Sequence, residues 1–80
     1  MKTPQIINEL LVELEKAEAK YPEWPKDIIH QAAIVNEESG ELIRAALNCA
    51  YHGEPKDEMI REAIQTGAMA IRFLKNIGNF

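Results

Sequence analysis

The chain has 80 residues, a formal net charge of −4 and a single cysteine. A chain this short forms one domain at most, buries a modest core, and cannot be held together by an intramolecular disulfide. The acidic balance argues against a general binder of nucleic acid, which usually presents a basic stripe. It does not argue against a nucleotide, because metal ions can compensate the charge of the phosphates.

No stretch of the sequence points to a membrane or to secretion. No apolar run approaches the roughly 18 residues that cross a bilayer. The opening letters MKTPQ lead directly into an amphipathic segment and do not resemble a signal peptide. The apolar content of 46% is ordinary for a folded domain. We therefore expect a cytoplasmic protein whose partners include neither a membrane nor a nucleic-acid polymer.

The first element that we expect is a helix over about residues 3–20. Thr3 suits the N-cap and Pro4 the first helical position, and Pro22 disfavours helical geometry just before it. Apolar residues recur at helical spacing: Ile7, Leu10, Leu11, Leu14 and Ala17. We predict a packing helix with no chemistry of its own.

A longer helix is expected over about residues 26–51, with Gly53 as its stop. Its predicted core face consists of Ile28, Ala32, Val35, Leu42, Ile43, Ala46 and Ala50. Ser39 and Gly40 lie on or beside this face, where small residues would let another helix approach closely. A third helix is expected over about residues 56–77, ended by Gly78. No stretch alternates like a strand, so we predict an all-α fold, with residues 1–80 as one domain of three antiparallel helices.

Acidic residues gather in the middle of the second predicted helix, in the stretch EESGE at positions 37–41. Glu38 and Glu41 share a helix face, as do Glu37 and Glu41, and such carboxylates repel each other by a few tenths of a kcal/mol. A solvated helix face produces the same pattern. However, a short turn between antiparallel helices would bring Glu62 and then Gln65 opposite these acids. Together they could hold Mg²⁺, which prefers oxygen ligands.

These two clusters resemble the mark of the MazG-like, all-α nucleoside triphosphate pyrophosphohydrolases, a superfamily that also includes dimeric dUTPases. That mark is EExxE on one helix and ExxD on the next. Here the first half is Glu37 to Glu41 and the second is Glu62 to Gln65, so glutamine replaces the aspartate. The resemblance covers about residues 27–77. The phrases HQAAIVNEESGELIRAAL and REAIQTGAMAIRFL are similar to small members that phages or prophages often encode.

The resemblance implies hydrolysis of a nucleoside triphosphate to a monophosphate and pyrophosphate, with Mg²⁺ or Mn²⁺ as cofactor. It implies Glu38, Glu41 and Glu62 as metal ligands, with Gln65 offering an uncharged amide oxygen. Glu37 would be a further ligand or a general base, so the implied catalytic residues are Glu37, Glu38 and Glu41. A homodimer or homotetramer is also implied, in which paired helices of two subunits complete a four-helix bundle and the pocket.

Five residues are candidates for contacts with the nucleotide: Trp24, His30, Arg44, Asn48 and Lys56. Trp24 could stack on a base, or it could be an apolar plug at the end of the bundle. His30 could contact phosphate, or it could cap or pack its helix. Arg44 and Lys56 could bind phosphate or serve solubility, and Asn48 could contact a base or ribose or be plain polar surface.

Two other functions stay open. Gln65 favours a catalytically degenerate helical oligomer that binds a ligand or regulates a partner. The pair Asp27 and His30 has the carboxylate-x-x-His spacing of di-iron bundles, but it stands at a helix start instead of deep inside a bundle. We therefore rank a di-iron protein last.

Overall fold

Three helices make up nearly all of the computed structural model, which describes residues 1–79. They are α1 (Thr3–Lys20), α2 (Ile28–His52) and α3 (Lys56–Asn76), and a short 3₁₀ helix, η1 (Ile77–Asn79), follows. No strand occurs within this described range. The all-α class and the three helices are therefore confirmed. None of the helices within residues 1–79 is both long and apolar enough to cross a membrane.

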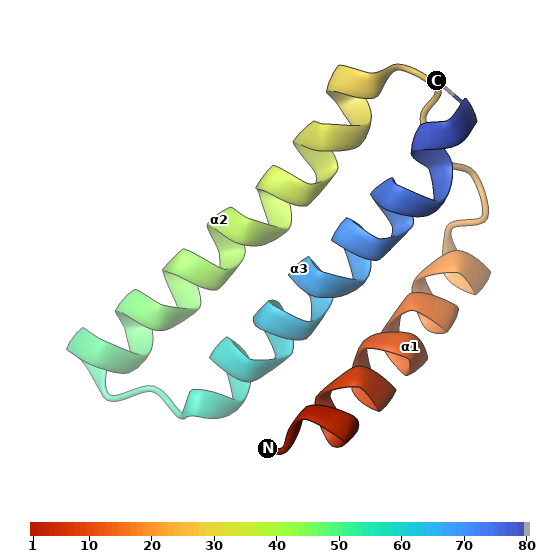
Figure 1. The fold of residues 1–80 in the computed structure, drawn as a ribbon. Coiled ribbons are helices and arrows are strands. Elements are labelled where there is room, and N and C mark those ends of the chain that lie inside the picture. The colour runs from red at the N-terminus through yellow and green to blue at the C-terminus, as the bar shows by residue number, and fades with distance from the viewer. Residues whose placement is uncertain (80) are drawn as a thin grey trace.

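α3 lies between α1 and α2; α2 runs antiparallel to both α1 and α3, and α1 and α3 run in the same direction (Figure 1). The connector from α1 to α2 passes over the C-terminal end of α3. Because α3 is covered on two sides, it holds most of the buried residues: Glu62, Ala68, Met69 and Arg72.

The helix ends follow local side-chain and backbone chemistry. Asp27 is the N-cap of α2, where its Oδ2 accepts a hydrogen bond of 2.9 Å from the backbone N–H of His30. Gly53 ends α2 with a φ of 67°, in the left-handed region that glycine adopts at little cost. The expected stop at Gly53 is confirmed, and α2 extends one residue beyond the predicted end, to His52.

Two predicted helix ends are wrong. Thr3 is the first residue of α1 instead of its cap, and Lys2 stands in the cap position without a side-chain hydrogen bond. α3 ends at Asn76, and the expected terminator Gly78 lies inside η1. Gly53 is the one described glycine with a positive φ. The tighter turn of η1 therefore takes the place of a left-handed glycine at the end of α3.

The core is small, with Leu14, Ala68 and Met69 at its centre. α1 packs tightly on α3 at Gly67, where a Cβ atom would lie 2.6 Å from the Cδ2 atom of Leu10. By contrast, a Cβ atom at Gly40 would meet nothing within 4 Å. The expected close approach of a helix at Gly40 does not occur within this chain.

α2 turns a different face toward α3 than the sequence predicted. Of the expected core residues, Ala32, Ile43 and Ala50 are exposed, Ile43 to 58%. Gln31 and Ala45 are buried instead. The predicted core face is therefore wrong in part. Val35 packs against the core, and Ile28, Leu42 and Ala46 are half-buried, but the centre of the apolar series lies to one side of the surface that meets α3.

Candidate functional site

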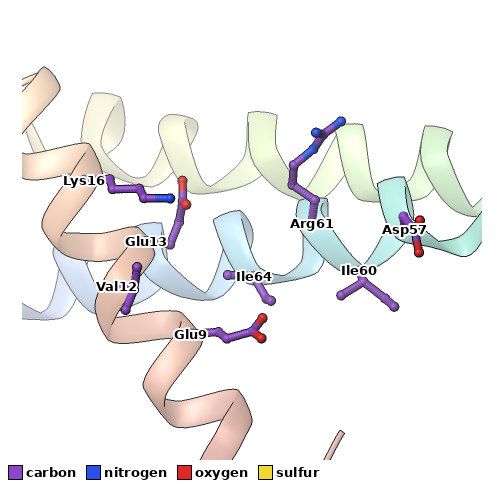
Figure 2. A pocket seen from close by; sticks show the side chains of 8 residues that line it. All are labelled: Glu9, Val12, Glu13, Lys16, Asp57, Ile60, Arg61 and Ile64. Atoms are coloured by element: carbon purple, nitrogen blue, oxygen red, sulfur yellow. The ribbon is translucent and has the colours of Figure 1, made fainter.

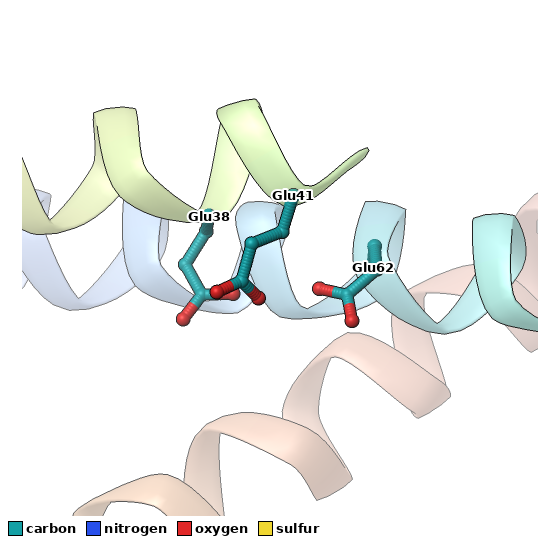
Figure 3. A group of neighbouring side chains, drawn as sticks. All are labelled: Glu38, Glu41 and Glu62. Carbon is teal, nitrogen blue, oxygen red and sulfur yellow. The ribbon is translucent and has the colours of Figure 1, made fainter. Parts of the chain in front are cut away.

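Three carboxylates from two helices face one another. Glu38 and Glu41 stand on consecutive turns of α2 and point toward Glu62 on α3 (Figure 3). One carboxylate oxygen of each lies within 4.8 Å of the other two. Two oxygens on opposite sides of one hard cation lie about 4–5 Å apart. The approach of Glu62 to the acids of α2, expected from an antiparallel turn, is observed, and we call these three residues the acidic cluster.

Burial makes the acidic cluster unlike a solvated helix face. Glu62 is only 9% exposed and Glu38 is half-buried, whereas Glu41 is exposed. The Oε2 atoms of Glu62 and Glu38 are buried and have no hydrogen-bond partner within the described chain. A buried acceptor without a partner costs about 1–3 kcal/mol. A bound cation would satisfy both oxygens at once.

The electrostatics of the acidic cluster also favour a bound cation. Burial raises the pKa of the Glu62 carboxyl, and the neighbouring carboxylates of Glu41 and Glu38 raise it further. Burial is also the largest cause of the raised pKa of Glu38, followed by the charges of Glu41, Glu37 and Glu13. A divalent cation would reverse these effects, because it favours the charged form of every ligand.

A hollow of about 350 Å³ opens beside Glu38, between all three helices. Its lining includes Gln65 of α3 and Lys16 and Lys20 of α1. The volume falls in the range of about 300–1,000 Å³ that is usual for small-ligand pockets. Gln65, the position that departs from the family motif, therefore lines the same hollow as Glu38.

A second hollow, of about 280 Å³, adjoins the other end of the acidic cluster. Glu41, Glu62 and Glu58 line it together with Arg44 and Asn48. Two of the five residues predicted to contact the nucleotide, Arg44 and Asn48, are therefore brought to the acids.

The remaining predicted residues lie elsewhere. Trp24 packs against the core and His30 is exposed in the first turn of α2. Lys56 is exposed at the start of α3, and Glu37 is exposed and stands outside the acidic cluster. None of Trp24, His30 and Lys56 lines either hollow beside the acids.

Arg72 holds the connector between α1 and α2. It is 4% exposed, and its Nη2 donates hydrogen bonds to the carbonyl oxygens of Tyr21 and Glu23. Its guanidinium also lies 4.8 Å from the centre of the Trp24 ring, a cation–π distance. These hydrogen bonds from Arg72 therefore hold the connector against α3 beside the first hollow.

The sequence analysis missed the contribution of α1. Glu13, Lys16 and Lys20 line the first hollow, a position that was not expected of a helix predicted only to pack. The signal was present, because residues 9, 13, 16 and 20 recur at helical spacing and are all charged.

A third hollow lies between α1 and α3 and shares Glu13 and Lys16 with the first (Figure 2). Arg61 and Asp57 line its α3 side, and Arg61 pairs with the exposed Glu58. No member of the acidic cluster lines this hollow.

No family model, no curated protein and no solved structure matches this chain. What the site can do follows from its own residues. It offers three oxygen ligands for a hard divalent cation, with lysine and arginine side chains on either side of them.

Proposed function

We propose that this chain is a metal-dependent nucleoside triphosphate pyrophosphohydrolase of the MazG-like type. The observation that supports this most is the environment of Glu62, a buried carboxylate within 4.8 Å of Glu38 and Glu41. One of its oxygens lacks a hydrogen-bond partner in the described chain. A helix pair built only for packing would bury an apolar residue there. Glu38, Glu41 and Glu62 would hold the cation, Mg²⁺ or Mn²⁺.

The proposed reaction is attack of water on the α-phosphorus of the nucleotide. A bond forms between the water oxygen and the α-phosphorus, and the bond from the α-phosphorus to the oxygen bridging to the β-phosphorus breaks. The products are a nucleoside monophosphate and pyrophosphate. When bound, Mg²⁺ neutralises phosphate oxygens and lowers the pKa of water. We assign acceptance of the proton from water to Glu37, which is exposed beside Glu38.

Chain residues must supply part of the positive charge that the triphosphate requires. A triphosphate carries about four negative charges, and the acidic cluster adds its own. Lys16 and Lys20 flank Glu38 in the first hollow, and Arg44 flanks Glu41 in the second. We assign phosphate contacts to these three residues and a base or ribose contact to Asn48. Arg72 is left out of this assignment, because its guanidinium already donates hydrogen bonds to carbonyl oxygens of the connector.

We further propose that the active species is a homodimer or a homotetramer. Few apolar residues are buried in one chain, Leu14, Ala68 and Met69 among them. Domains this small usually gain stability from a metal or from association.

The test is pyrophosphate release from a panel of ribo- and deoxynucleoside triphosphates, with and without Mg²⁺. We expect one class of nucleotide to be hydrolysed only with the metal, and Glu38→Gln to abolish release. Glu15→Gln is the matched control, because Glu15 is an exposed glutamate of α1 that lines none of the three hollows described above. Unchanged release by Glu38→Gln would overturn the proposal.

Gln65 favours a second candidate function, a catalytically degenerate oligomer that binds a nucleotide or a partner without turnover. Gln65 is half-buried and lines the hollow beside Glu38, where an aspartate would add a negative charge to those of the acidic cluster. If the natural chain shows no turnover and Gln65→Asp creates it, this second function is supported. Turnover by the natural chain rules it out.

Calorimetry distinguishes the two candidate functions, the enzyme and the degenerate oligomer, from a protein whose acidic cluster binds no metal. Mg²⁺ is titrated up to millimolar concentration, with and without non-hydrolysable nucleotide analogues. Metal-dependent binding of an analogue without turnover of the nucleotide supports the degenerate oligomer. Absence of metal binding contradicts the proposed enzyme.

A further inference from the structure

Glu13 is an acid of α1 that lies beside the acidic cluster. It lines the first hollow together with Glu38, and its side chain extends from α1 toward α2 (Figure 2). Its negative charge is one of the causes that raise the pKa of the Glu38 carboxyl. The acidic cluster itself takes its carboxylates from α2 and α3, so Glu13 adds a charge from the remaining helix.

The packing of α1 on α3 fixes the place of Glu13. Leu14, the next residue, is buried in the core that α1 shares with α3. One turn earlier, Leu10 packs on Gly67, where the absence of a Cβ atom leaves room for it. Glu13 is therefore held at the first hollow by the apolar residues next to it in the helix.

No ion pair explains why Glu13 is half-buried. Another acid of α1, Glu18, pairs with Lys75 of α3. Glu13 takes part in neither of the two ion pairs formed within residues 1–79, although Lys16 follows at a spacing that permits pairing on a helix. A half-buried carboxylate that is unpaired and stands beside another carboxylate is unfavourable in the metal-free chain. A nearby cation would make the same position favourable.

Gln65 lines the same hollow and carries no charge. It is half-buried, and it stands where the ExxD motif that this chain resembles has aspartate. The hollow beside Glu38 therefore receives an acid from α1 and an amide from α3. Because both side chains line one hollow, a carboxylate at either position would bring its charge to the same place.

We infer that Glu13 supplies the acid that position 65 lacks, and that it holds the cation through one of the cation's waters. Mg²⁺ keeps several of its waters when it binds a protein, so a carboxylate beside the direct ligands can accept a hydrogen bond from one of them. An observation independent of the number of acids points to a cation here. Glu62 of the acidic cluster is only 9% exposed, and its Oε2 has no hydrogen-bond partner in the described chain.

This inference rests on the cation of the proposed function, but it does not depend on turnover. Affinity for Mg²⁺ is measured without nucleotide, whereas hydrolysis is measured by pyrophosphate release. The two proposals can therefore fail separately.

The test is the affinity for Mg²⁺ by calorimetry on the full chain without nucleotide. We expect Glu13→Gln to weaken Mg²⁺ binding about 10-fold or more, the effect typical of residues that support metal ligands. Glu15→Gln is the matched control on α1 and should bind Mg²⁺ like the natural chain, because Glu15 is exposed and does not line the first hollow. The double variant Glu13→Gln with Gln65→Asp should regain most of the lost affinity, since aspartate returns a carboxylate to the same hollow.

Urea unfolding without metal distinguishes this role from a structural one. Glu13→Gln should be at least as stable as the natural chain, because it removes a charge that stands beside Glu38. A less stable Glu13→Gln would assign Glu13 to the fold and overturn the inference.

The affinities decide the rest. A natural chain that binds Mg²⁺ with unchanged affinity in Glu13→Gln overturns this inference alone, as does a loss that Gln65→Asp fails to restore. A natural chain that binds no Mg²⁺ overturns both this inference and the proposed enzyme. If the expected affinities are found but no nucleotide is hydrolysed, the role of Glu13 is supported and the enzyme is overturned.

Discussion

The two faces of α2 depart in opposite ways from the usual distribution of residues. The acidic face buries part of its charge, with Glu38 half-buried beside the buried Glu62 of α3. The side of α2 without charged residues exposes apolar side chains such as Ile43. We call this side the charge-free face, and it consists of Ile28, Ala32, Val35, Ser39, Ile43, Ala46 and Ala50. In a soluble protein, charged groups are seldom buried without a partner, and large apolar surfaces usually mark an interface. For the acidic face, the partner that we propose is a cation.

The two faces can be tested separately although they share one helix. Glu41 and Ile43 are two residues apart, which places their side chains about 200° apart around the helix axis. A substitution at one of them leaves the surface around the other unchanged. The comparison therefore predicts that metal chemistry and association fail independently.

The largest effect is expected from Glu41→Gln on the acidic face. Loss of a carboxylate ligand should lower turnover by more than about 100-fold, since even residues that only support a metal ligand are worth about 10–100-fold. Pyrophosphate release measures the effect. The molar mass of this variant should equal that of the natural chain, and a variant that dissociates would contradict the separation of the two faces.

Leu47→Gln makes the converse change at the edge of the charge-free face. Leu47 is 50% exposed, so its loss should hardly affect the folding of one chain. If the proposed homodimer uses this face, both copies lose apolar contact, about 1–2 kcal/mol each, which weakens dimerisation on the order of 30-fold or more. Sedimentation at several concentrations gives the dissociation constant. Mg²⁺ affinity should be unchanged, and a parallel loss of metal binding would show that the faces are coupled.

Glu62→Gln should have opposite effects with and without metal. Without metal, it removes a buried negative charge and supplies an amide that can donate to Glu38 or Glu41, so stability should rise by about 1 kcal/mol. With Mg²⁺ at about 100 times its dissociation constant, the natural chain should gain about 2.7 kcal/mol that the variant lacks. Urea unfolding in both conditions measures this reversal. A metal-free variant less stable than the natural chain would mean that the charge of Glu62 stabilises the fold.

The pH dependence of stability follows from the same carboxylates. Glu38 and Glu62 have a pKa above the ordinary 4.5, so the folded chain binds protons more tightly than the unfolded chain does. Stability of the metal-free protein should therefore rise as the pH falls from about 7 to about 5, with no further gain from these groups once the pH is below their pKa in the unfolded chain. Urea midpoints across this range test the sign. The double variant Glu38→Gln with Glu62→Gln is the control and should show a flatter dependence.

The sequence predicted the helices well because their ends are marked by local chemistry. Pro22, Pro55 and Gly53 act on their immediate neighbours, and the observed boundaries lie within about two residues of the predicted ones. The sequence could not predict which side of α2 meets α3. Hydrophobic periodicity marks a side that avoids water, but it does not say whether the same chain or another copy covers it. Ile43 and Ala45 show this, since the expected core residue is exposed and its neighbour is buried.

The acidic cluster, like the helix ends, could be predicted from the sequence because local geometry determines it. Glu38 and Glu41 follow from helical spacing, and Glu62 follows from a short turn between antiparallel helices. The charged series on α1 was visible in the sequence, but its place beside Glu38 was not, because that place depends on packing between segments more than fifteen residues apart. A local period shows which residues share a helix face, and it does not show which other segment that face meets.

Gly40→Ala is the smallest of the expected effects and tests whether the proposed oligomer covers this part of α2. Gly40 is exposed, and on the helix surface it has Glu37 on one side and Ile43 on the other. Alanine is favoured over glycine inside a helix by about 1 kcal/mol, and a Cβ atom here meets nothing within 4 Å in the single chain. We expect a gain of about 0.5–1 kcal/mol in urea unfolding with an unchanged molar mass. If the gain is absent and association weakens, a second copy passes over Gly40, and the interface of the proposed oligomer includes the border between the charge-free face and the acidic face.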